Sequence, residues 1–232
     1  MFLTVLVGFL LGLTVPVIAS RFGKILPADP GLVCAQLWHK PHFPKVPDLQ
    51  RTNMLKMKWI KLIIFSIGWG FVISVLFGMV QAYIQPDMFG FACAFIYIVS
   101  LLIAVDQQYY LLPDFFTIPL LLLGVSAAFA VPMESLSLAD RLVGAWFGYL
   151  LSTVSVFIMA FFRKAEFGAG DVKMLTALGA WFGVLGLNYT LILSFFFFYI
   201  CSVYKKQTSG AFGPALGIAS ILVFFYLYMN LW

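Results

Sequence analysis

The chain has 232 residues, of which 63% are hydrophobic and only 10% are charged, and its mean hydropathy is +1.02. Soluble domains carry roughly 25% charged residues, and a soluble core of this size could not absorb so much apolar surface. The net charge of +5 does not indicate a nucleic-acid partner, because the basic residues lie in the loops between apolar segments. We therefore predict an all-α polytopic membrane protein that contacts the lipid bilayer.

Eight apolar segments approach the length of about 17–25 residues that a spanning helix needs. The first lacks a preceding basic stretch, so we interpret it as a retained anchor rather than a signal peptide. The sixth and seventh are short and separated only by Asn188, so they form either two full spans or one bent hairpin. In chain order the segments are 2–19, 62–84, 89–105, 115–131, 142–162, 172–187, 189–204 and 211–231.

Residues 20–61 form the one sizeable loop, which is basic and contains five prolines. Prolines at this density predict turns and little regular structure. The loop contains Cys34, His39 and His42, but no C-x-x-C pair. We therefore expect exposed histidines and no metal site in this loop.

The positions of lysine and arginine predict the orientation, because cytoplasmic loops carry an excess of both. With eight spans, every basic residue except Arg141 falls on one face, counting Lys173 at its rim. That face is predicted to be cytoplasmic, and both termini are predicted to lie outside. The loops that share the cytoplasmic face are 20–61, 106–114, 163–171 and 205–210.

Two carboxylates, Asp106 and Asp171, fall on the cytoplasmic face at the ends of predicted helices. Two carboxyl groups that share a proton can hydrolyse a peptide, because the ionised one activates water while the protonated one polarises the scissile carbonyl. Gly168 and Gly170 permit a tight turn before Asp171, near a helix N-terminus where the macrodipole favours negative charge. Asp106 instead ends a helix, so we expect Asp171 to ionise more readily.

Other interpretations remain open for these residues. Asp106 alone is equally consistent with a solvated loop residue, and Asp171 with a helix cap. Asp114 follows Leu-Leu-Pro and favours an N-cap of the next helix. The same two aspartates would also suit a proton- or ion-coupled transporter, although we find no repeated halves in the sequence. The acidic residues of the outer loops, interpreted as solvated turn residues, are Asp87, Glu134 and Asp140.

The segments around both aspartates resemble the bacterial type IV prepilin peptidases, which are aspartic proteases of the membrane. Asp106 followed by Leu-Pro-Asp at 112–114 resembles the family's first aspartate stretch. Glu-Phe-Gly-Ala-Gly-Asp-Val-Lys-Met-Leu at 166–175 resembles the second, and Phe-Gly-Pro at 212–214 resembles a third motif before the last helix. Val105 before Asp106 disfavours a related class of Gly-x-Gly-Asp intramembrane protease, in which a tyrosine is expected there.

The resemblance implies an active site at the cytoplasmic rim of a bacterial inner membrane protein. It implies cleavage of a short basic leader, after a glycine, from type IV prepilins or from the pseudopilins of type II secretion. Asp106 and Asp171 are implied as the catalytic pair, with Gly168 and Gly170 in the active-site turn. The residues implied to support catalysis or to bind the leader are Asp114, Glu166 and Lys173.

One departure from the family concerns the first cytoplasmic loop. Many relatives carry two C-x-x-C pairs there and methylate the new N-terminus with S-adenosylmethionine, whereas this loop has only Cys34. We expect no zinc and no cofactor for the peptidase, and S-adenosylmethionine only if the protein also methylates. The chain is thus divided into 1–61, the first helix with its basic loop lacking the zinc cysteines, and 62–232, a seven-helix aspartic peptidase domain.

Overall fold

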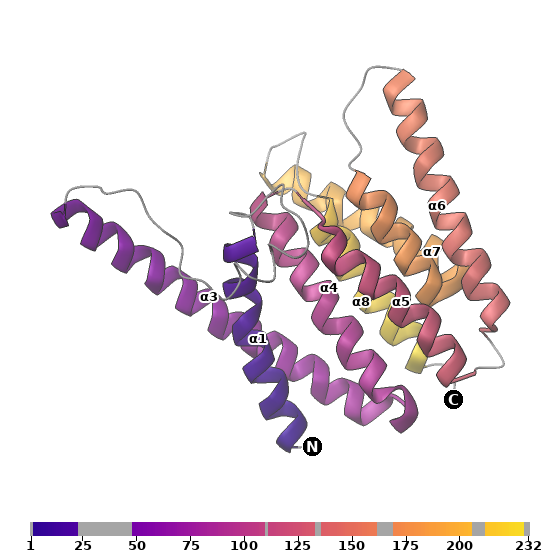
Figure 1. The fold of residues 1–232 in the computed structure, drawn as a ribbon, viewed down its shortest axis with the longest axis horizontal. Coiled ribbons are helices and arrows are strands. Elements are labelled where there is room, and N and C mark those ends of the chain that lie inside the picture. Colours follow the sequence, from indigo (N-terminus) through magenta and orange to yellow (C-terminus); the bar gives the residue numbers. More distant parts are fainter. Residues whose placement is uncertain are drawn as a thin grey trace. The chain divides into compact units, whose positions relative to one another are not determined.

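A computed structural model describes residues 2–22, 48–109, 111–132, 136–161, 169–205 and 212–229. This part of the chain is built from helices, as predicted, and falls into two compact units, Met1–Met79 and Val80–Trp232. The helices are shown in Figure 1. In chain order they are α1 Phe2–Phe22, α3 Asp48–Tyr83, the short 3₁₀ helix η1 Pro86–Met88, α4 Phe89–Tyr109, α5 Asp114–Ala130, α6 Leu138–Phe161, α7 Ala169–Lys205 and α8 Gly213–Met229.

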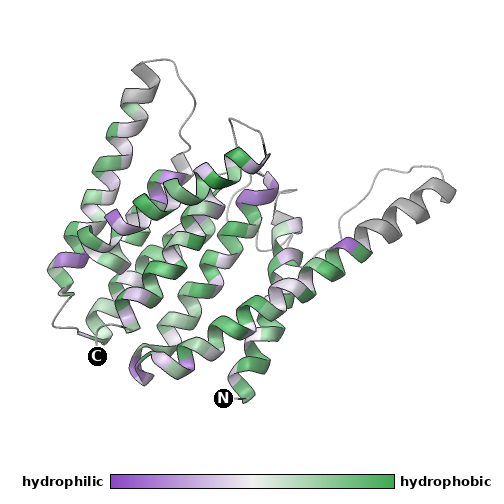
Figure 2. Ribbon diagram, turned by 180° about the vertical axis from the view of Figure 1, so that it is seen from behind, coloured by the Kyte–Doolittle hydropathy of each residue, from purple (hydrophilic) through white to green (hydrophobic). Residues whose placement is uncertain are grey.

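Four helical segments are long and apolar enough to cross a membrane, namely Phe2–Ser20, Trp59–Tyr83, Pro86–Tyr109 and Gly170–Tyr204. The apolar helices α5 and α8 are shorter, with 17 residues each. Hydrophobic residues run along most of the length of these helices in Figure 2. A membrane protein is therefore supported, while the number of eight spans stays a prediction.

In the first unit, α1 packs closely against α3. A Cβ atom at Gly12 would lie 2.6 Å from the Gly70 Cα, so only a glycine allows this approach of the two backbones. The Ser74 hydroxyl donates a hydrogen bond to the Val5 carbonyl over 3.0 Å. Small residues at a helix crossing and an interhelical hydrogen bond are typical of packing in membranes.

The prediction of little regular structure is wrong for the end of the large loop, because α3 begins at Asp48 and runs through 48–61 as helix. The last proline of the loop is Pro47, so no helix-breaking residue opposes the helix beyond it. The stretch 23–47, with Cys34, His39 and His42, lies outside the described residues. The predictions about metal and histidine exposure in this loop therefore stay predictions.

In the second unit α7 is the central helix, in contact with α5, α6 and α8, while α4 contacts α5 and α8. The core around it is aromatic. The ring centroid of the fully buried Trp181 lies 4.7 Å from that of Phe95 and 6.0 Å from that of Phe224. The indole N–H of Trp181 donates to the Leu120 carbonyl over 2.9 Å, which attaches α7 to α5.

A kink divides α7 into two helical arms at Gly183, where φ is 65° and ψ is −172°. This region of backbone conformation is populated essentially by glycine alone. The sequence prediction placed the break at Asn188, which instead lies in regular helix. Asparagine is only a weak helix breaker, whereas Gly183 supplies a conformation that ends the first arm.

The seam between α6 and the first arm of α7 is formed by glycines. Gly144 and Gly179 face each other so closely that a Cβ on Gly144 would lie 2.5 Å from the Gly179 carbonyl oxygen. One turn along α6, Gly148 faces Leu175, and a Cβ on Gly148 would lie 2.6 Å from the Leu175 carbonyl oxygen. The same pentapeptide, Gly-Ala-Trp-Phe-Gly, occurs on both helices at 144–148 and 179–183, a repeat that the sequence analysis missed.

The beginning of α6 corrects two predictions about the outer loops. Arg141, expected at the end of an outer loop, instead lies fully buried in the first turn of α6, and its guanidinium carbon lies 5.9 Å from the ring centroid of Tyr228. Asp140 accepts hydrogen bonds from the Ser137 hydroxyl and N–H, while the Asp140 N–H donates to the Ser137 hydroxyl. This reciprocal capping box begins α6, so Asp140 is a helix-end residue rather than a turn residue. Asp87 is exposed in η1, as predicted.

Candidate active site

Four helix ends meet at one end of the second unit: the last turn of α4 and the first turns of α5, α7 and α8. The contacts that join them are Asp106 with Gly213, Leu112 with Gly170, and Asp114 with Lys173. We call this region the carboxylate end, defined by Asp106, Asp114, Asp171, Lys173 and Gly213. Residues more than 100 positions apart in sequence are thus brought together at one end of the bundle.

Asp106 lies in the last turn of α4, which continues to Tyr109, and only 5% of its surface is exposed. The interpretation of Asp106 as a solvated loop residue is therefore wrong. Its Oδ2 accepts a hydrogen bond from the Gly213 N–H over 2.9 Å, at the first residue of α8. A buried carboxyl group held by a backbone N–H keeps a fixed position, as a reacting group must.

Gly213 is needed at this contact because of space. A Cβ atom there would lie 2.5 Å from Asp106 Oδ2 and 2.8 Å from Cγ, so a side chain would displace the carboxyl group or the start of α8. The neighbouring Phe212 contacts α7, since its ring centroid lies 5.5 Å from that of Phe195 and 5.7 Å from that of Phe198. Sequence reasoning used 212–214 only as a family motif and did not assign Gly213 to Asp106.

Asp171 lies half-buried in the first turn of α7, so its predicted place at a helix N-terminus is confirmed. The preceding Gly170 packs on the link between α4 and α5, where a Cβ atom would lie 2.7 Å from Leu112 Cβ. This close approach fixes the first turn of α7 beside the first turn of α5. Gly168 and Glu166 lie outside the described residues, so their predicted roles stay predictions.

Asp114 and Lys173 form an ion pair, with the lysine Nζ 2.6 Å from Oδ1 and 2.5 Å from Oδ2. The prediction of Asp114 as an N-cap is wrong, because the N-cap position of α5 is Pro113 and carries no side-chain cap. Asp114 is one residue further along, and its carboxylate reaches across to α7 instead. The side chains of Asp114 and Lys173 are 54% and 47% exposed, so the pair lies at the surface, where ion pairs contribute only about 0–1 kcal/mol.

The chemistry available at the carboxylate end is that of carboxyl groups, an ammonium group and backbone N–H groups. Among the described residues, no three His, Cys, Asp or Glu side chains gather in a way that could hold a metal ion. Asp106 and Asp171 belong to adjoining helix ends and differ in environment, one buried and held by an N–H, the other half-buried in a first turn. Different environments are what allow two carboxyl groups to take different proton-transfer roles.

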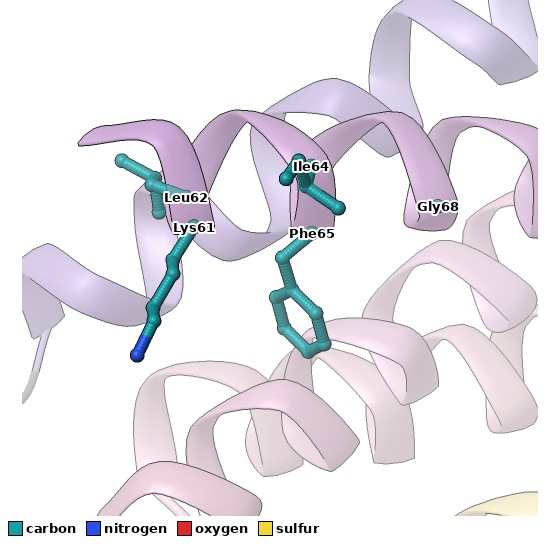
Figure 3. Close-up of a pocket in the computed structure, with 5 residues that line it drawn as sticks. All are labelled: Lys61, Leu62, Ile64, Phe65 and Gly68. Atoms are coloured by element: carbon teal, nitrogen blue, oxygen red, sulfur yellow. The ribbon is translucent and has the colours of Figure 1, made fainter. Parts of the chain in front are cut away.

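The structure also describes a hollow in the first unit, which does not contain these carboxylates. It is an open hollow of about 550 Å³ on α3, lined by Lys61, Leu62, Ile64, Phe65 and Gly68. In Figure 3 the side chains of Lys61 and Phe65 point to the same side of α3. Its lining includes no carboxylate and belongs to the first unit, so we do not associate it with the aspartates.

Comparison with known proteins gives the same family as the sequence motifs. Residues 91–203 match the model of the Type IV leader peptidase family. This region contains Asp106, Asp114, Asp171 and Lys173, and ends before Gly213. No solved structure matches the chain.

Three relatives illustrate the similarity. A prepilin leader peptidase/N-methyltransferase of Klebsiella pneumoniae is 41% identical over 95 residues, which are 40% of this chain and 41% of that protein. One of Pseudomonas aeruginosa is 40% identical over 126 residues, 50% of this chain and 42% of that protein. A type 4 prepilin-like proteins leader peptide-processing enzyme of Escherichia coli is 31% identical over 159 residues, 65% of this chain and 57% of that protein.

The chain spans about half the length of the curated relatives it matches, between 41% and 57% for these three. The matched region nevertheless includes both aspartates and most of the helices that carry them. The resemblance predicted from the sequence is thereby confirmed, with residues 91–203 as the part of the chain that matches the type IV leader peptidase family.

Proposed function

We propose that the chain is a membrane aspartic endopeptidase that removes the leader from type IV prepilins or prepilin-like proteins. The observation that carries this proposal is the placement of Asp106 and Asp171 on adjoining helix ends within the region that matches the family. Ionisable residues in membrane helices are costly and are by default a functional hypothesis. The buried and fixed position of Asp106 supports a chemical role over a solvating one.

In the proposed reaction a water molecule attacks the scissile carbonyl carbon of the substrate. One aspartate is ionised and takes a proton from this water, while the other is protonated and donates a hydrogen bond to the carbonyl oxygen. The amide C–N bond then breaks, and the leaving nitrogen receives a proton from the carboxyl group that took it from water. We assign the ionised role to Asp171, because the first turn of a helix favours negative charge.

The proposed substrate segment is a short basic leader cut after a glycine at the cytoplasmic side of a bacterial inner membrane. In this orientation the carboxylate end faces the cytoplasm, and both termini lie outside. Asp114 lies half-exposed at the surface of this end and Glu166 precedes the turn, so both are proposed to attract the leader's basic residues. Such attraction weakens as salt screens exposed charges.

The direct test compares Asp106→Asn and Asp171→Asn with wild type, using the full chain in detergent and a prepilin as substrate. Each variant is expected to lower kcat by about 10³-fold or more, because an amide can neither take the proton from water nor share one. The double variant should be no slower than either single one. Asp87→Asn, at an exposed acid in η1, is the matched control and should cleave like wild type. A folded Asp106→Asn or Asp171→Asn protein that cleaves at the wild-type rate would exclude that residue from the pair.

Methylation is tested in the same assay by adding S-adenosylmethionine and measuring the mass of the product. We place two carboxyl groups and an ion pair at the carboxylate end. These groups suit hydrolysis, and we assign none of them to binding S-adenosylmethionine. We therefore propose no step through S-adenosylmethionine. A product heavier by one methyl group would add that activity without changing the peptidase assignment.

The hydrogen bond between Asp106 and Gly213 provides a second test. Gly213→Ala is expected to lower kcat by roughly 10²-fold, because the added Cβ would overlap Asp106 Oδ2 and displace the carboxyl group by a fraction of an ångström or more. Gly90→Ala is the matched control, since a Cβ at Gly90 meets no atom within 4 Å. Equal activity of the two variants would contradict the role of α8 in holding Asp106.

A further inference from the structure

Two buried hydroxyl groups, Ser100 Oγ on α4 and Thr117 Oγ1 on α5, have no hydrogen-bond partner within the described part of the chain. Ser100 is 0% and Thr117 is 1% exposed. A buried hydroxyl left without a partner destabilises the fold, so each such group calls for an explanation. The usual one is an ordered water molecule or a ligand that completes the hydrogen bond.

Thr117 differs from two threonines of α7. The hydroxyls of Thr176 and Thr190 each donate to the carbonyl four residues earlier, over 2.8 Å in both cases. For Thr117 the corresponding carbonyl is that of Pro113, which already accepts the N–H groups of Phe116 and Thr117 over 3.1 and 3.2 Å. The hydroxyl of Thr117 therefore projects into the bundle without the local bond that threonine normally makes in a helix.

The contacts between α5 and α7 give the depth of Thr117. Three residues nearer the carboxylate end, Asp114 binds Lys173. Three residues further from that end, the Leu120 carbonyl accepts the indole N–H of Trp181. Thr117 lies between these two contacts, on the same buried stripe of α5 as Leu120. Its hydroxyl is thus buried beside the part of α7 between Lys173 and Trp181, which follows the turn that carries Asp171.

Asp106 and Thr117 are equally far along their helices from the link between α4 and α5. Asp106 comes three residues before the end of α4, and Thr117 comes three residues after the start of α5, so each is about 4.5 Å along its helix from the link between them. The two helices are in contact. Ser100 lies six residues, or about 9 Å, further from the carboxylate end along α4.

We propose that the Thr117 hydroxyl holds the water molecule that attacks the substrate, an inference that rests on the proposed peptidase function. Oγ1 accepts a hydrogen bond from one O–H of the water, and the ionised aspartate accepts the other. A lone pair of the water oxygen is then directed at the scissile carbonyl carbon. The proton released on attack passes to the aspartate, and Thr117 gains and loses none, so it acts as a positioning residue.

The test measures kcat and KM for prepilin cleavage with Thr117→Val, which keeps the shape but removes the hydroxyl. We expect kcat to fall roughly 10- to 100-fold with KM unchanged, since loss of positioning affects the reaction more than binding. Thr117→Ser keeps the hydroxyl and should retain most of the wild-type kcat. Ser100→Ala removes the other unpartnered hydroxyl, far from the carboxylates, and should cleave like wild type.

Resistance to heating in detergent separates this role from a purely structural one. Thr117→Val should be as stable as wild type, because an unpartnered hydroxyl contributes no hydrogen bond within the protein. If Thr117→Val does not fold, Thr117→Ala takes its place with the same expected loss of kcat. A wild-type kcat in the folded valine or alanine variant, or an equal loss in Ser100→Ala, would overturn the proposal while leaving the peptidase function intact. A folded wild-type protein that cleaves no prepilin would instead overturn the peptidase function.

Discussion

The pentapeptide Gly-Ala-Trp-Phe-Gly occurs twice, and its two copies differ in burial and in backbone conformation. In α6, Trp146 is 63% exposed and its ring lies 6.1 Å from that of Tyr149. In α7, Trp181 is fully buried and donates a hydrogen bond to another helix. The last glycine is regular helix at Gly148 but forms the kink at Gly183. Identical residues thus acquire different roles from the position of their helix, one at the side of the bundle and one at its centre.

The largest expected effect separates the two tryptophans. Trp181→Ala should destabilise the protein by about 3–5 kcal/mol, because a large buried side chain leaves a cavity. Trp146→Ala should change stability by less than about 0.5 kcal/mol, as is usual for exposed positions. The fraction of protein that survives heating in detergent, measured by size-exclusion chromatography, checks this difference. Similar losses for both variants would mean that the copies are not distinguished by burial.

The second prediction concerns the glycines with which the two copies face each other. Gly179→Ala should cost about 1–3 kcal/mol, because its Cβ would overlap the backbone of Gly144 and force α6 away from α7. Gly68→Ala in α3, where a Cβ meets no atom within 4 Å, is the control and should be neutral or slightly stabilising. The double variant Gly144→Ala with Gly179→Ala should cost less than the sum, since one shift of α6 relieves both overlaps. Additive costs measured in the same heating assay would argue against a shared seam.

A third prediction concerns the kink. Gly183→Ala and Gly183→Asn should each cost about 1–3 kcal/mol, because φ of 65° with ψ of −172° suits glycine alone. Asparagine often replaces glycine in the left-handed helical region, but this ψ lies outside that region. Thermal survival of both variants is the measurement. A stable Gly183→Asn protein would show that α7 tolerates a different bend.

The smallest effect is expected at the start of α6. Hydrogen bonds from the Ser137 hydroxyl and N–H hold the pKa of the Asp140 carboxyl below its usual value of 3.8. The ionised form therefore adds stability above about pH 4, and this stability is lost as the pH falls through the lowered pKa. Asp140→Asn should reduce thermal survival slightly at about pH 7, and the difference from wild type should shrink toward about pH 3. A difference that grows on acidification would contradict this capping role.

Hydropathy predicted the helices well, because a long apolar segment favours the bilayer and can satisfy its backbone hydrogen bonds there as a helix. The same signal could not place Arg141, since its burial against Tyr228 depends on the contact between α6 and α8. Nor could it place the kink, because glycine and asparagine both interrupt a helical pattern and only the packing decides between Gly183 and Asn188. The helical stretch 48–61 had a signal in Pro47 followed by Asp48, a typical helix start.

Both aspartates could be singled out from the sequence because carboxylates are rare beside apolar segments. Gly213 and Thr117 could not, since their importance comes from register between helices. The Gly213 N–H meets Asp106 across 107 positions of sequence. The ion pair between Asp114 and Lys173 could not be predicted from the sequence either. The local pattern favoured helix capping for Asp114 and did not indicate a partner on another helix.

The kink in α7 has a consequence for how the protein enters the membrane. The first arm, from Ala169 to Gly183, is about 22 Å long at 1.5 Å per residue, shorter than the roughly 30 Å of hydrocarbon in a bilayer. Its first turns also contain Asp171 and Lys173, so the uncharged stretch of this arm, 174–183, is shorter than the roughly 17–25 residues that a spanning helix needs. We expect this arm to enter the bilayer only together with the helices that pack against it. Insertion of α7 would then depend on α5 and α6 already being in place to shelter it during synthesis.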